Sequence, residues 1–366
     1  MRSTASSAAT NAIVQDRRRF VRQAAFGLAA GGSGLMGLAS AQPAIGSESA
    51  DAGFTEIGKA STWINSPRLT PADLRGKVVL VQFWTYTCIN WLRSQPFVRA
   101  WSEHYRDDGL VVIGVHAPEY SFEKNIDNVR RASAALKVAS PIVVDNEHAI
   151  WRAFDNQYWP AMYFIDTKGR IRHTQFGEGD YARSESALRR LLGEAGAQPR
   201  GQAPVDPHAF ELAANWASLK SQENYLGAAR TQQFASPGGV RAGSHAYALP
   251  ARWRLNDWAL AGDWTVADEA ASLDKAEGRL ASRFHARDLH MVLGPKSPGT
   301  RVAFRVRIDG QPPGASHGLD VDADGNGMLA DQRLYQLIRQ PPPIRDRQFE
   351  IQFAAPGAQA FAFTFG

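Results

Sequence analysis

The sequence has 366 residues, of which 44% are hydrophobic and 21% are charged. This length predicts two domains, and the composition is that of a globular protein, which excludes a largely disordered chain. The formal net charge of +5 is concentrated at the N-terminus, because residues 1–41 carry five arginines against one aspartate and the remainder carries +1. The charge therefore gives no reason to expect a nucleic-acid-binding surface.

The N-terminus has the pattern of an export signal. Arg17-Arg18-Arg19-Phe20-Val21 fits a twin-arginine motif, an apolar stretch of about 15 residues follows from Ala24, and Ala39-Ser40-Ala41 offers a cleavage site. We expect residues 1–41 to be a twin-arginine signal peptide and the mature protein to be periplasmic or secreted. The alternative is that the uncleaved segment anchors the protein, but it is short and glycine-rich for a membrane span.

The next part of the chain alternates strand patterns with helix patterns. Residues 42–60 are rich in Gly, Ser and Ala and are expected to be a flexible lead-in, of which we assign 42–51 to a separate segment before the first domain. Continuous apolar runs that alternate with helices predict an α/β domain over 52–195. Strands are expected at 63–65, 77–84, 109–115 and 141–145, helices at 88–105, 122–136 and 147–154, and a hairpin at 158–166 and 170–176 before a last helix that Ser184 would cap.

The pattern changes after residue 195. Residues 196–208 hold three prolines and predict a linker. Beyond it apolar residues recur with period two, most clearly over 301–309, 349–353 and 361–365. Such runs with turn residues between them predict an antiparallel β-sandwich, jelly-roll-like, over 209–366.

Cys88, the only cysteine in the sequence, lies where the strand expected at 77–84 gives way to a helix. In an oxidising compartment a lone cysteine is a free thiol, an inert buried thiol, or half of an intermolecular bridge. The free N–H groups of a helix N-terminus lower the pKa of a thiol placed there. We therefore expect Cys88 to act as a nucleophile, and the alternative is a small buried hydrophobic residue.

The segment around Cys88 resembles the active site of thioredoxin-like proteins. Trp84, Cys88-Ile89-Asn90-Trp91 and Pro96 match it, but Trp91 stands in the place of the second, resolving cysteine. Two further segments extend the resemblance to proteins of the DipZ type: Asn156-Gln157-Tyr158-Trp159-Pro160 and Phe234-Ala235-Ser236-Pro237-Gly238-Gly239. That family joins a thioredoxin-like domain to a carbohydrate-binding-module-like β-sandwich. Many of its members also carry an N-terminal multi-span electron-transfer domain, which this sequence does not include.

The resemblance implies a substrate groove and a partner. It places Trp84, Trp91, Trp159 and Pro160 in the groove, with Pro160 in a cis peptide bond opposite Cys88. It implies a protein thiol or disulfide as the partner, with an electron donor on a separate membrane chain. Without a resolving thiol, turnover stalls at the mixed disulfide unless an outside thiol completes it. Gln82 stands where the family often has a buried aspartate, which is consistent with that loss; the alternative is a satisfied buried amide.

His116 follows the strand expected at 109–115 and ends at the same sheet edge as Cys88. Its imidazole is a candidate proton relay to the thiol, and the alternative is a loop histidine without a task. The segment Thr85-Tyr86-Thr87-Cys88 also has the Thr-x-x-Cys spacing of peroxiredoxins, but Val81 replaces the proline of that motif. A one-cysteine peroxidase is therefore the weaker hypothesis.

The β-domain has two candidate ligand sites. Asp320, Asp322 and Asp324 have the D-x-D-x-D-G spacing of a calcium loop, and the alternative is an Asp/Gly turn. Trp253, Trp258 and Trp264 form a candidate platform for a glycan, against the alternative that they belong to the core. We expect no required cofactor, and the histidines show no metal-ligand spacing.

Two functions remain open at this point. The first is an exported protein that takes part in thiol–disulfide chemistry through Cys88. The second is a non-catalytic protein whose thioredoxin groove and β-sandwich bind a partner or a glycan. The absence of the resolving cysteine leaves enzymatic turnover undecided.

Overall fold

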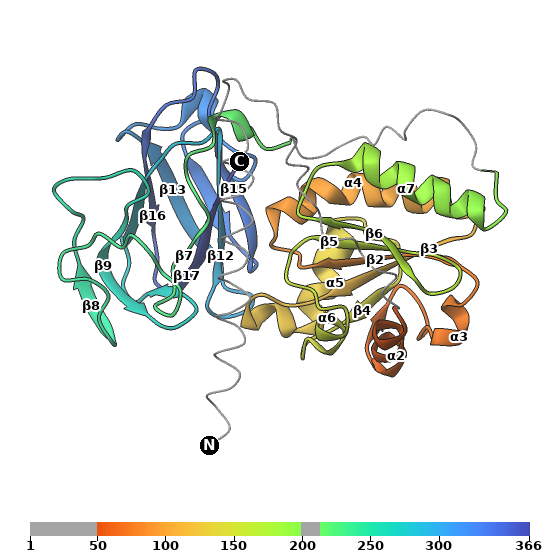
Figure 1. Cartoon of the computed structure of the whole chain (residues 1–366). Helices are drawn as coiled ribbons and strands as arrows, with labels where there is room; N and C mark the ends of the chain where they lie inside the picture. The colour runs from red at the N-terminus through yellow and green to blue at the C-terminus, as the bar shows by residue number, and fades with distance from the viewer. Residues whose placement is uncertain (1–49, 199–212) are drawn as a thin grey trace, which may run out of the picture. The chain divides into compact units, whose positions relative to one another are not determined.

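The computed structural model of the chain describes residues 50–198 and 213–366. The chain divides into two compact units, Met1–Phe210 and Glu211–Gly366 (Figure 1), and each is considered by itself. The signal peptide expected at 1–41 and most of the linker expected at 196–208 lie outside the described residues. Among the described residues, no helix combines the length and the apolar character that a membrane crossing requires.

The first unit is built on a six-stranded mixed sheet with the order β1-β4-β3-β2-β5-β6. The three strands β2, β3 and β4 are parallel, and β1, β5 and β6 join the sheet antiparallel to their neighbours. The strands are β1 (Trp63–Ile64), β2 (Val78–Trp84), β3 (Leu110–His116), β4 (Ile142–Val144), β5 (Ala161–Ile165) and β6 (Ile171–Phe176). The helices are α2 (Asp51–Lys59), α3 (Pro71–Leu74), α4 (Ile89–His104), η1 (Ser121–Lys124), α5 (Ile126–Ala135), α6 (Ala149–Ala153) and α7 (Tyr181–Glu194).

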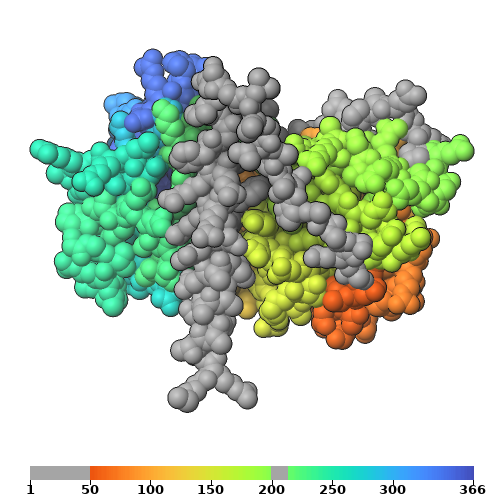
Figure 2. All heavy atoms as spheres, viewed as in Figure 1, coloured from red at the N-terminus to blue at the C-terminus, as the bar shows by residue number. Residues whose placement is uncertain are grey.

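Helices cover both faces of this sheet. Figure 1 shows α4 and α7 together on one face, with α2 and α6 on the other. Under α4 and α7 lies an apolar core that includes Leu80, Trp101 and Leu188, all fully buried. On the opposite face Phe83 packs edge-on against Trp151 of α6. Arg183 and Arg190 of α7 are exposed, whereas Ser184 is buried, and atoms of this helix (light green) form part of the surface in Figure 2.

The sequence pattern places β2 correctly because every residue from Val78 to Trp84 is buried. A strand covered on both faces has no solvent side, so it shows a continuous apolar run instead of alternation. Since β2 and β3 run parallel in register, their carboxyl ends meet at one edge, with Trp84 opposite His116. Cys88 follows that edge. The expected α/β fold is confirmed in this unit.

Three local expectations are wrong. The flexible lead-in expected to run to residue 60 is wrong from Asp51 onward, where the helix α2 (Asp51–Lys59) begins. The single helix expected at 122–136 is divided into η1 and α5 at Asn125, whose side chain caps α5 by accepting from Asp127 N. Ser184 does not cap the last helix, because α7 begins at Tyr181 and Ser184 is buried within it. In the second place the cap at Asn125 was missed, and in the third a cap was assigned to the wrong residue.

The second unit is all antiparallel β. Along its described residues, nine strands form a continuous hydrogen-bonded path, β14-β13-β16-β11-β9-β10-β17-β12-β15, which β7 joins beside β17 and β8 beside β9. The strands are β7 (Asn224–Tyr225), β8 (Ser244–Tyr247), β9 (Trp258–Val266), β10 (Ala271–Leu273), β11 (Arg279–Phe284), β12 (Asp288–Pro295), β13 (Val302–Ile308), β14 (Asn326–Leu329), β15 (Arg333–Arg339), β16 (Arg347–Phe353) and β17 (Ala358–Phe365), with short 3₁₀ turns η2 (Trp216–Ser218) and η3 (Gly314–Ser316).

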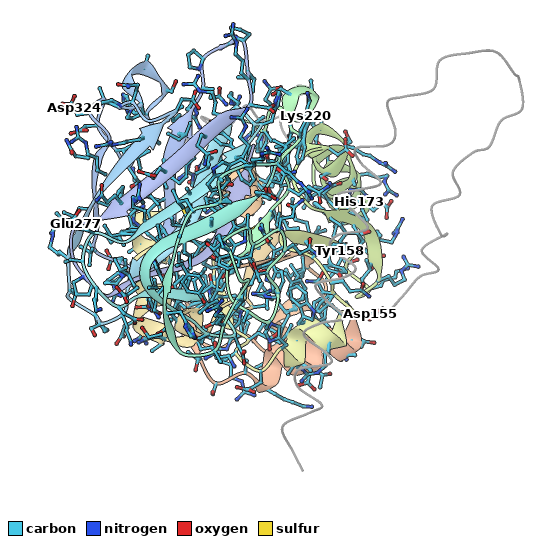
Figure 3. All side chains as sticks on the ribbon, turned by 90° about the vertical axis from the view of Figure 1, so that its left-hand side faces the viewer. Asp155, Tyr158, His173, Lys220, Glu277 and Asp324 are labelled. Carbon is cyan, nitrogen blue, oxygen red and sulfur yellow. The ribbon has the colours of Figure 1, made fainter. Side chains whose placement is uncertain are left out.

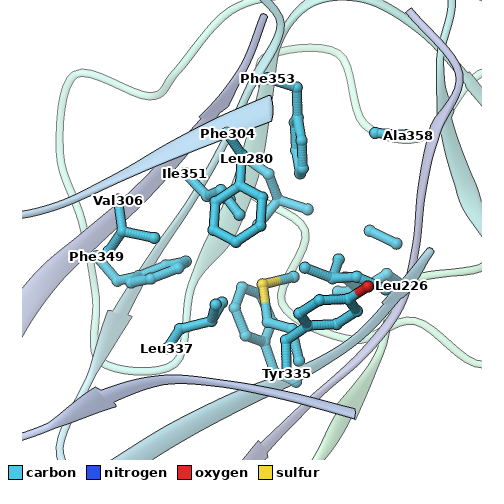
Figure 4. Close-up of a cluster of buried hydrophobic side chains, with 14 of the residues drawn as sticks. Leu226, Leu280, Phe304, Val306, Tyr335, Leu337, Phe349, Ile351, Phe353 and Ala358 are labelled. Carbon is cyan, nitrogen blue, oxygen red and sulfur yellow. The ribbon is translucent and has the colours of Figure 1, made fainter. Parts of the chain in front are cut away.

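The inward side chains of these strands share one core, which confirms the β-sandwich. Figure 4 shows part of it, with side chains that converge from three strands: Phe304 of β13, Tyr335 of β15, and Phe349 and Phe353 of β16. Along β13 buried and more exposed residues alternate, as the period of two in the sequence predicts.

One strand belongs to both layers of the sandwich. The first half of β9 pairs with β11, and its second half pairs with β8 and β10. The change occurs at Gly262, whose φ of +93° lies in the region that favours glycine. A Cβ at this position would also lie 3.2 Å from the Cα of Gly278. A glycine is therefore needed where the strand passes from one layer to the other.

Candidate functional site

Cys88 lies in the turn between β2 and α4, at the residue that caps the helix. Its amide donates a hydrogen bond to the Thr85 carbonyl (3.3 Å), and its own carbonyl accepts one from Leu92 N (3.0 Å). Its backbone is extended, with φ −79° and ψ 112°, while Ile89 begins the helix. Cys88 therefore lies beside the first N–H groups of α4, which have no partner within the helix. The residue is 5% exposed.

The thiol lies against the segment that precedes β5. Cys88 Sγ is 3.8 Å from the Trp159 carbonyl oxygen, to which the thiol donates a hydrogen bond. The Trp159–Pro160 peptide bond is cis, as the resemblance implies. Trp159 is also held by the end of β3, because its Nε1 donates to the Ala117 carbonyl (3.0 Å). The geometry thus brings together three of the predicted site residues: Cys88, Trp159 and Pro160.

Trp84 and Trp91 pack against each other in the interior. Their rings stack with centroids 4.2 Å apart and planes 23° apart, and each residue is 1% exposed. Trp84 also covers Gly114 on β3, where a Cβ would lie 2.8 Å from Trp84 Nε1. The place of a resolving cysteine is therefore filled by an indole that belongs to the core. The groove role given to these two residues stays a prediction, and their side chains have little surface to offer to a partner.

Gln82 is a buried amide with a partner. Its Nε2 donates to Ser94 Oγ (3.3 Å), and Ser94 Oγ in turn donates to the Trp91 carbonyl (2.8 Å). Both Gln82 and Ser94 are buried. The side-chain amide of Gln82 joins β2 to α4 and carries no charge. At the position where the family often has a buried aspartate, this chain therefore has a structural hydrogen bond.

His116 ends β3 with its ring in the aromatic cluster around Trp84. The ring meets Trp84 edge-on (centroids 4.9 Å apart) and stacks on Tyr86 (5.8 Å), and the residue is fully buried. Within the described residues neither ring nitrogen has a hydrogen-bond partner. Burial lowers the pKa of His116 to about 3. An imidazole with so low a pKa is a poor base for a thiol, which argues against the proton relay.

A buried carboxylate near Cys88 was not anticipated from the sequence. Glu123 in η1 is fully buried and accepts a hydrogen bond from Thr87 Oγ1 (2.6 Å), the residue before Cys88. The sequence pattern placed Glu123 inside a long helix, where a glutamate is usually solvated. Recognising Asn125 as the cap of a separate helix would have moved Glu123 into the loop that follows β3.

A buried ion pair was missed as well. Arg93, one turn after Cys88 in α4, pairs with Glu178 across 3.3 Å, and both side chains are nearly inaccessible (3% and 6% exposed). Glu178 follows Gly177, whose amide donates to the Pro160 carbonyl (2.8 Å). The pair therefore links the helix that begins at Cys88 to the segment that supports the cis-proline. The two charges are 85 residues apart in sequence, so no local pattern joins them.

The candidate glycan platform is largely part of the core. Trp258 and Trp264 are fully buried in the core of the second unit, and Trp253 is half-buried. The core alternative is thus confirmed for Trp258 and Trp264. Glycan binding by this unit stays a prediction that these two indoles do not support.

The candidate calcium loop makes its own protein contacts. Asp320 pairs with Arg333 (2.6 Å), and Asp322 accepts hydrogen bonds from Asn326 in a turn. Asp324 lies at the periphery of the β-domain (Figure 3). In the part of the chain that the structure describes, no three His, Cys, Asp or Glu side chains converge as a metal site. Calcium binding stays a prediction, which thermal unfolding with and without Ca²⁺ would check.

Comparison with known proteins agrees with this architecture. Residues 65–192 match the Redoxin family, and residues 221–366 match the family described as thioredoxin like C-terminal domain. The chain is 31% identical over 140 residues to the thiol-disulfide oxidoreductase YkuV of Bacillus subtilis, with 38% of this chain and 93% of that protein covered. The chain belongs to the thioredoxin-like family.

The similarity of this thioredoxin-like protein to DipZ includes the β-domain. The chain is 35% identical to Protein DipZ of Mycobacterium tuberculosis over 307 residues, and this aligned stretch covers 83% of the chain and 41% of DipZ. The chain thus spans less than half the length of that relative. A solved thioredoxin-like protein in the oxidised form shares 33% identity, with 37% of this chain and 90% of that chain covered and a TM-score of 0.34.

Proposed function

We propose that this thioredoxin-like protein exchanges disulfides through Cys88 alone. The observation that carries the proposal is the placement of Cys88 Sγ at the start of α4, 3.8 Å from the carbonyl of the residue before a cis-proline. This arrangement presents a thiol beside helix N–H groups, which favour the thiolate. A partner chain that reaches the thiol would meet the Trp159 backbone at the same place.

The proposed step is a balanced exchange. The Cys88 thiolate attacks one sulfur of a partner disulfide, the partner's sulfur–sulfur bond breaks, and a mixed disulfide with Cys88 forms. The second partner sulfur leaves as a thiolate and takes up the proton that Cys88 released. Because Trp91 replaces the resolving cysteine, a thiol from another molecule must attack the mixed disulfide to complete the cycle. That donor is a small thiol or a protein thiol, which includes one on a separate membrane chain.

The test is reaction of the native, full-length chain with 5,5′-dithiobis(2-nitrobenzoic acid). We expect release of one thionitrobenzoate per chain, a mixed disulfide on Cys88 visible by mass spectrometry, and no release from Cys88→Ser. With dithiothreitol as the outside thiol, insulin reduction should proceed faster with the wild type than with Cys88→Ser. A thiol that reacts only after denaturation would contradict the proposal.

A second function, binding without catalysis, is favoured by one observation. Cys88 is only 5% exposed and Trp91 is part of the core, so the thiol offers little surface for reaction. In that case wild type and Cys88→Ser would reduce insulin equally. The one-cysteine peroxidase is the third candidate, and consumption of hydrogen peroxide with a thiol donor would distinguish it from disulfide exchange.

We also propose that residues 1–41 direct twin-arginine export, so that the protein works in the periplasm or outside the cell. The support is the sequence pattern of Arg17-Arg18-Arg19, the apolar stretch and Ala39-Ser40-Ala41. Replacing Arg17 and Arg18 with lysine should retain the precursor inside the cell. Mass spectrometry of exported protein should find Gln42 at its N-terminus, whereas an intact N-terminus on membranes would indicate an anchor.

A further inference from the structure

The loop that follows β3 contacts the turn that precedes Cys88 in two ways. Glu123 Oε1 accepts the hydrogen bond from Thr87 Oγ1 (2.6 Å), and Glu123 Oε2 accepts from the amides of Glu119 (2.6 Å) and Tyr120 (3.0 Å). A second contact joins the same two segments, because the rings of Tyr86 and Phe122 lie 6.2 Å apart. The carboxylate thus connects its own loop to the residue immediately before the thiol.

The charge on Glu123 is not neutralised by a cation. Glu123 is fully buried and, in the described part of the chain, forms no ion pair. The charged neighbour that acts on it is Glu119, which has the same sign. Three hydrogen-bond donors offset part of the cost of burying a carboxylate. Burial nevertheless raises the pKa of Glu123 to about 7.

The two histidines on the surrounding elements do not change charge near neutral pH. His116 on β3 contacts Tyr86, and burial lowers its pKa to about 3. His148 at the start of α6 acts on His116, and burial together with the charge of Lys124 lowers its pKa to about 4. Both imidazoles are therefore neutral above about pH 5. A change of charge beside this turn near pH 7 is thus expected from Glu123 and not from these histidines.

We infer that Glu123 is a positioning residue for Cys88, which fixes the Thr85–Thr87 turn through Thr87 and whose charge opposes ionisation of the thiol. The inference rests on the proposed function, since it matters only if Cys88 reacts. Glu123 thus supplies the site with a carboxylate from the loop after β3, whereas position 82 on β2, where the family often has a buried aspartate, holds a neutral glutamine. Thr87 links the two, because its hydroxyl donates the hydrogen bond that joins the carboxylate to the turn.

The sign of the effect follows from electrostatics. A nearby negative charge disfavours a second one, so ionised Glu123 should raise the pKa of the thiol. A like charge within about 10 Å, at an effective dielectric constant of about 20, shifts a pKa by roughly one unit, or about tenfold in thiolate population. Replacing the carboxylate with an amide of the same shape should therefore increase thiolate reactivity near pH 7.

The experiment measures the rate of Cys88 alkylation by iodoacetamide between pH 5 and 10 on the full-length chain. The reaction forms a carbon–sulfur bond, expels iodide and releases the thiol proton, so its rate reports the thiolate. In Glu123→Gln we expect alkylation to be about twofold faster at pH 7, where about half of the wild-type carboxyl groups are ionised, with the ratio approaching about tenfold as pH rises above 8, and we expect the inflection near pH 7 to disappear. In Thr87→Val, which keeps the carboxylate but removes a donor to it, the inflection should move to higher pH, whereas Thr87→Ser should match the wild type.

The outcomes separate this inference from the function on which it rests. If native wild type is not alkylated at any pH, the proposed function fails. If wild type reacts but folded Glu123→Gln has the same pH profile, the inference is overturned and the function survives. Should Glu123→Gln fail to fold, the comparison of Thr87→Val with Thr87→Ser decides, and identical profiles overturn the inference. A purely structural glutamate would lower stability without moving the inflection.

Discussion

Replacing Trp91 with cysteine restores the Cys-x-x-Cys spacing but removes an indole from the core. Trp91 is 1% exposed and stacks on Trp84 at 4.2 Å between ring centroids. Truncating a buried tryptophan costs about 3–5 kcal/mol, which includes about 0.5–1.5 kcal/mol from a stacked ring pair. Since a domain has a free energy of unfolding of roughly 5–15 kcal/mol, Trp91→Cys should retain the fold with a much reduced margin.

The assay is urea unfolding of the full-length chain followed by far-UV circular dichroism, because tryptophan fluorescence would change with the substitution itself. Trp91→Phe is the matched control, as it keeps an aromatic ring beside Trp84 and should lose clearly less stability. Below its unfolding range Trp91→Cys should reduce insulin faster than wild type, because a second thiol can resolve the mixed disulfide. A loss of less than about 1 kcal/mol in Trp91→Cys would refute the argument that this indole is a core element.

Three further predictions concern other parts of the two units. The pKa of Glu123 is raised from 4.5 to about 7, so the folded state favours the protonated form. The contribution of this shift to the free energy of unfolding is fully present below about pH 4.5, is lost as pH rises through 7, and amounts to about 3 kcal/mol. Urea unfolding at pH 5 and pH 8 should show this difference in the wild type and not in Glu123→Gln. Arg93→Ala leaves Glu178 buried without this partner and should cost about 3–5 kcal/mol, whereas the double replacement Arg93→Met with Glu178→Leu should cost less; equal losses would contradict the role of the charge. Gly262→Ala places a side chain at a residue with positive φ and should lower the free energy of unfolding of the β-domain by about 1–3 kcal/mol. The rate of Cys88 alkylation in the folded protein should stay unchanged.

The elements that follow from local patterns were predictable. β2 and β3 are marked by continuous apolar runs, and β13 by alternation, because burial on two faces or one face leaves a direct trace in the sequence. The break at Asn125 was not seen, since a cap inside a helix-like pattern competes with propensity and only tertiary contacts decide it. The helix α2 was hidden by a Gly/Ser/Ala-rich composition that favours a flexible segment.

The site divides in the same way. Cys88 and Pro160 could be placed because each belongs to a short motif with a known neighbourhood. The contacts that surround them could not, because Thr87 and Glu123 are 36 residues apart and Arg93 and Glu178 are 85 residues apart. Single charged residues in loops give no sequence signal of burial. Their burial is a property of the folded chain, and it creates both the raised pKa of Glu123 and the Arg93–Glu178 pair.

The passage of β9 between layers has a consequence for dissecting the β-domain. A fragment that stops before Gly262 would contain β8 but not the second half of β9, with which β8 pairs. A fragment that starts at Gly262 would keep β10 paired but would lack the first half of β9, with which β11 pairs. Neither piece would keep a complete set of strand neighbours. The β-domain should therefore be expressed as one piece. Shorter versions of it should be made by trimming loops and not by removing one layer of the sandwich.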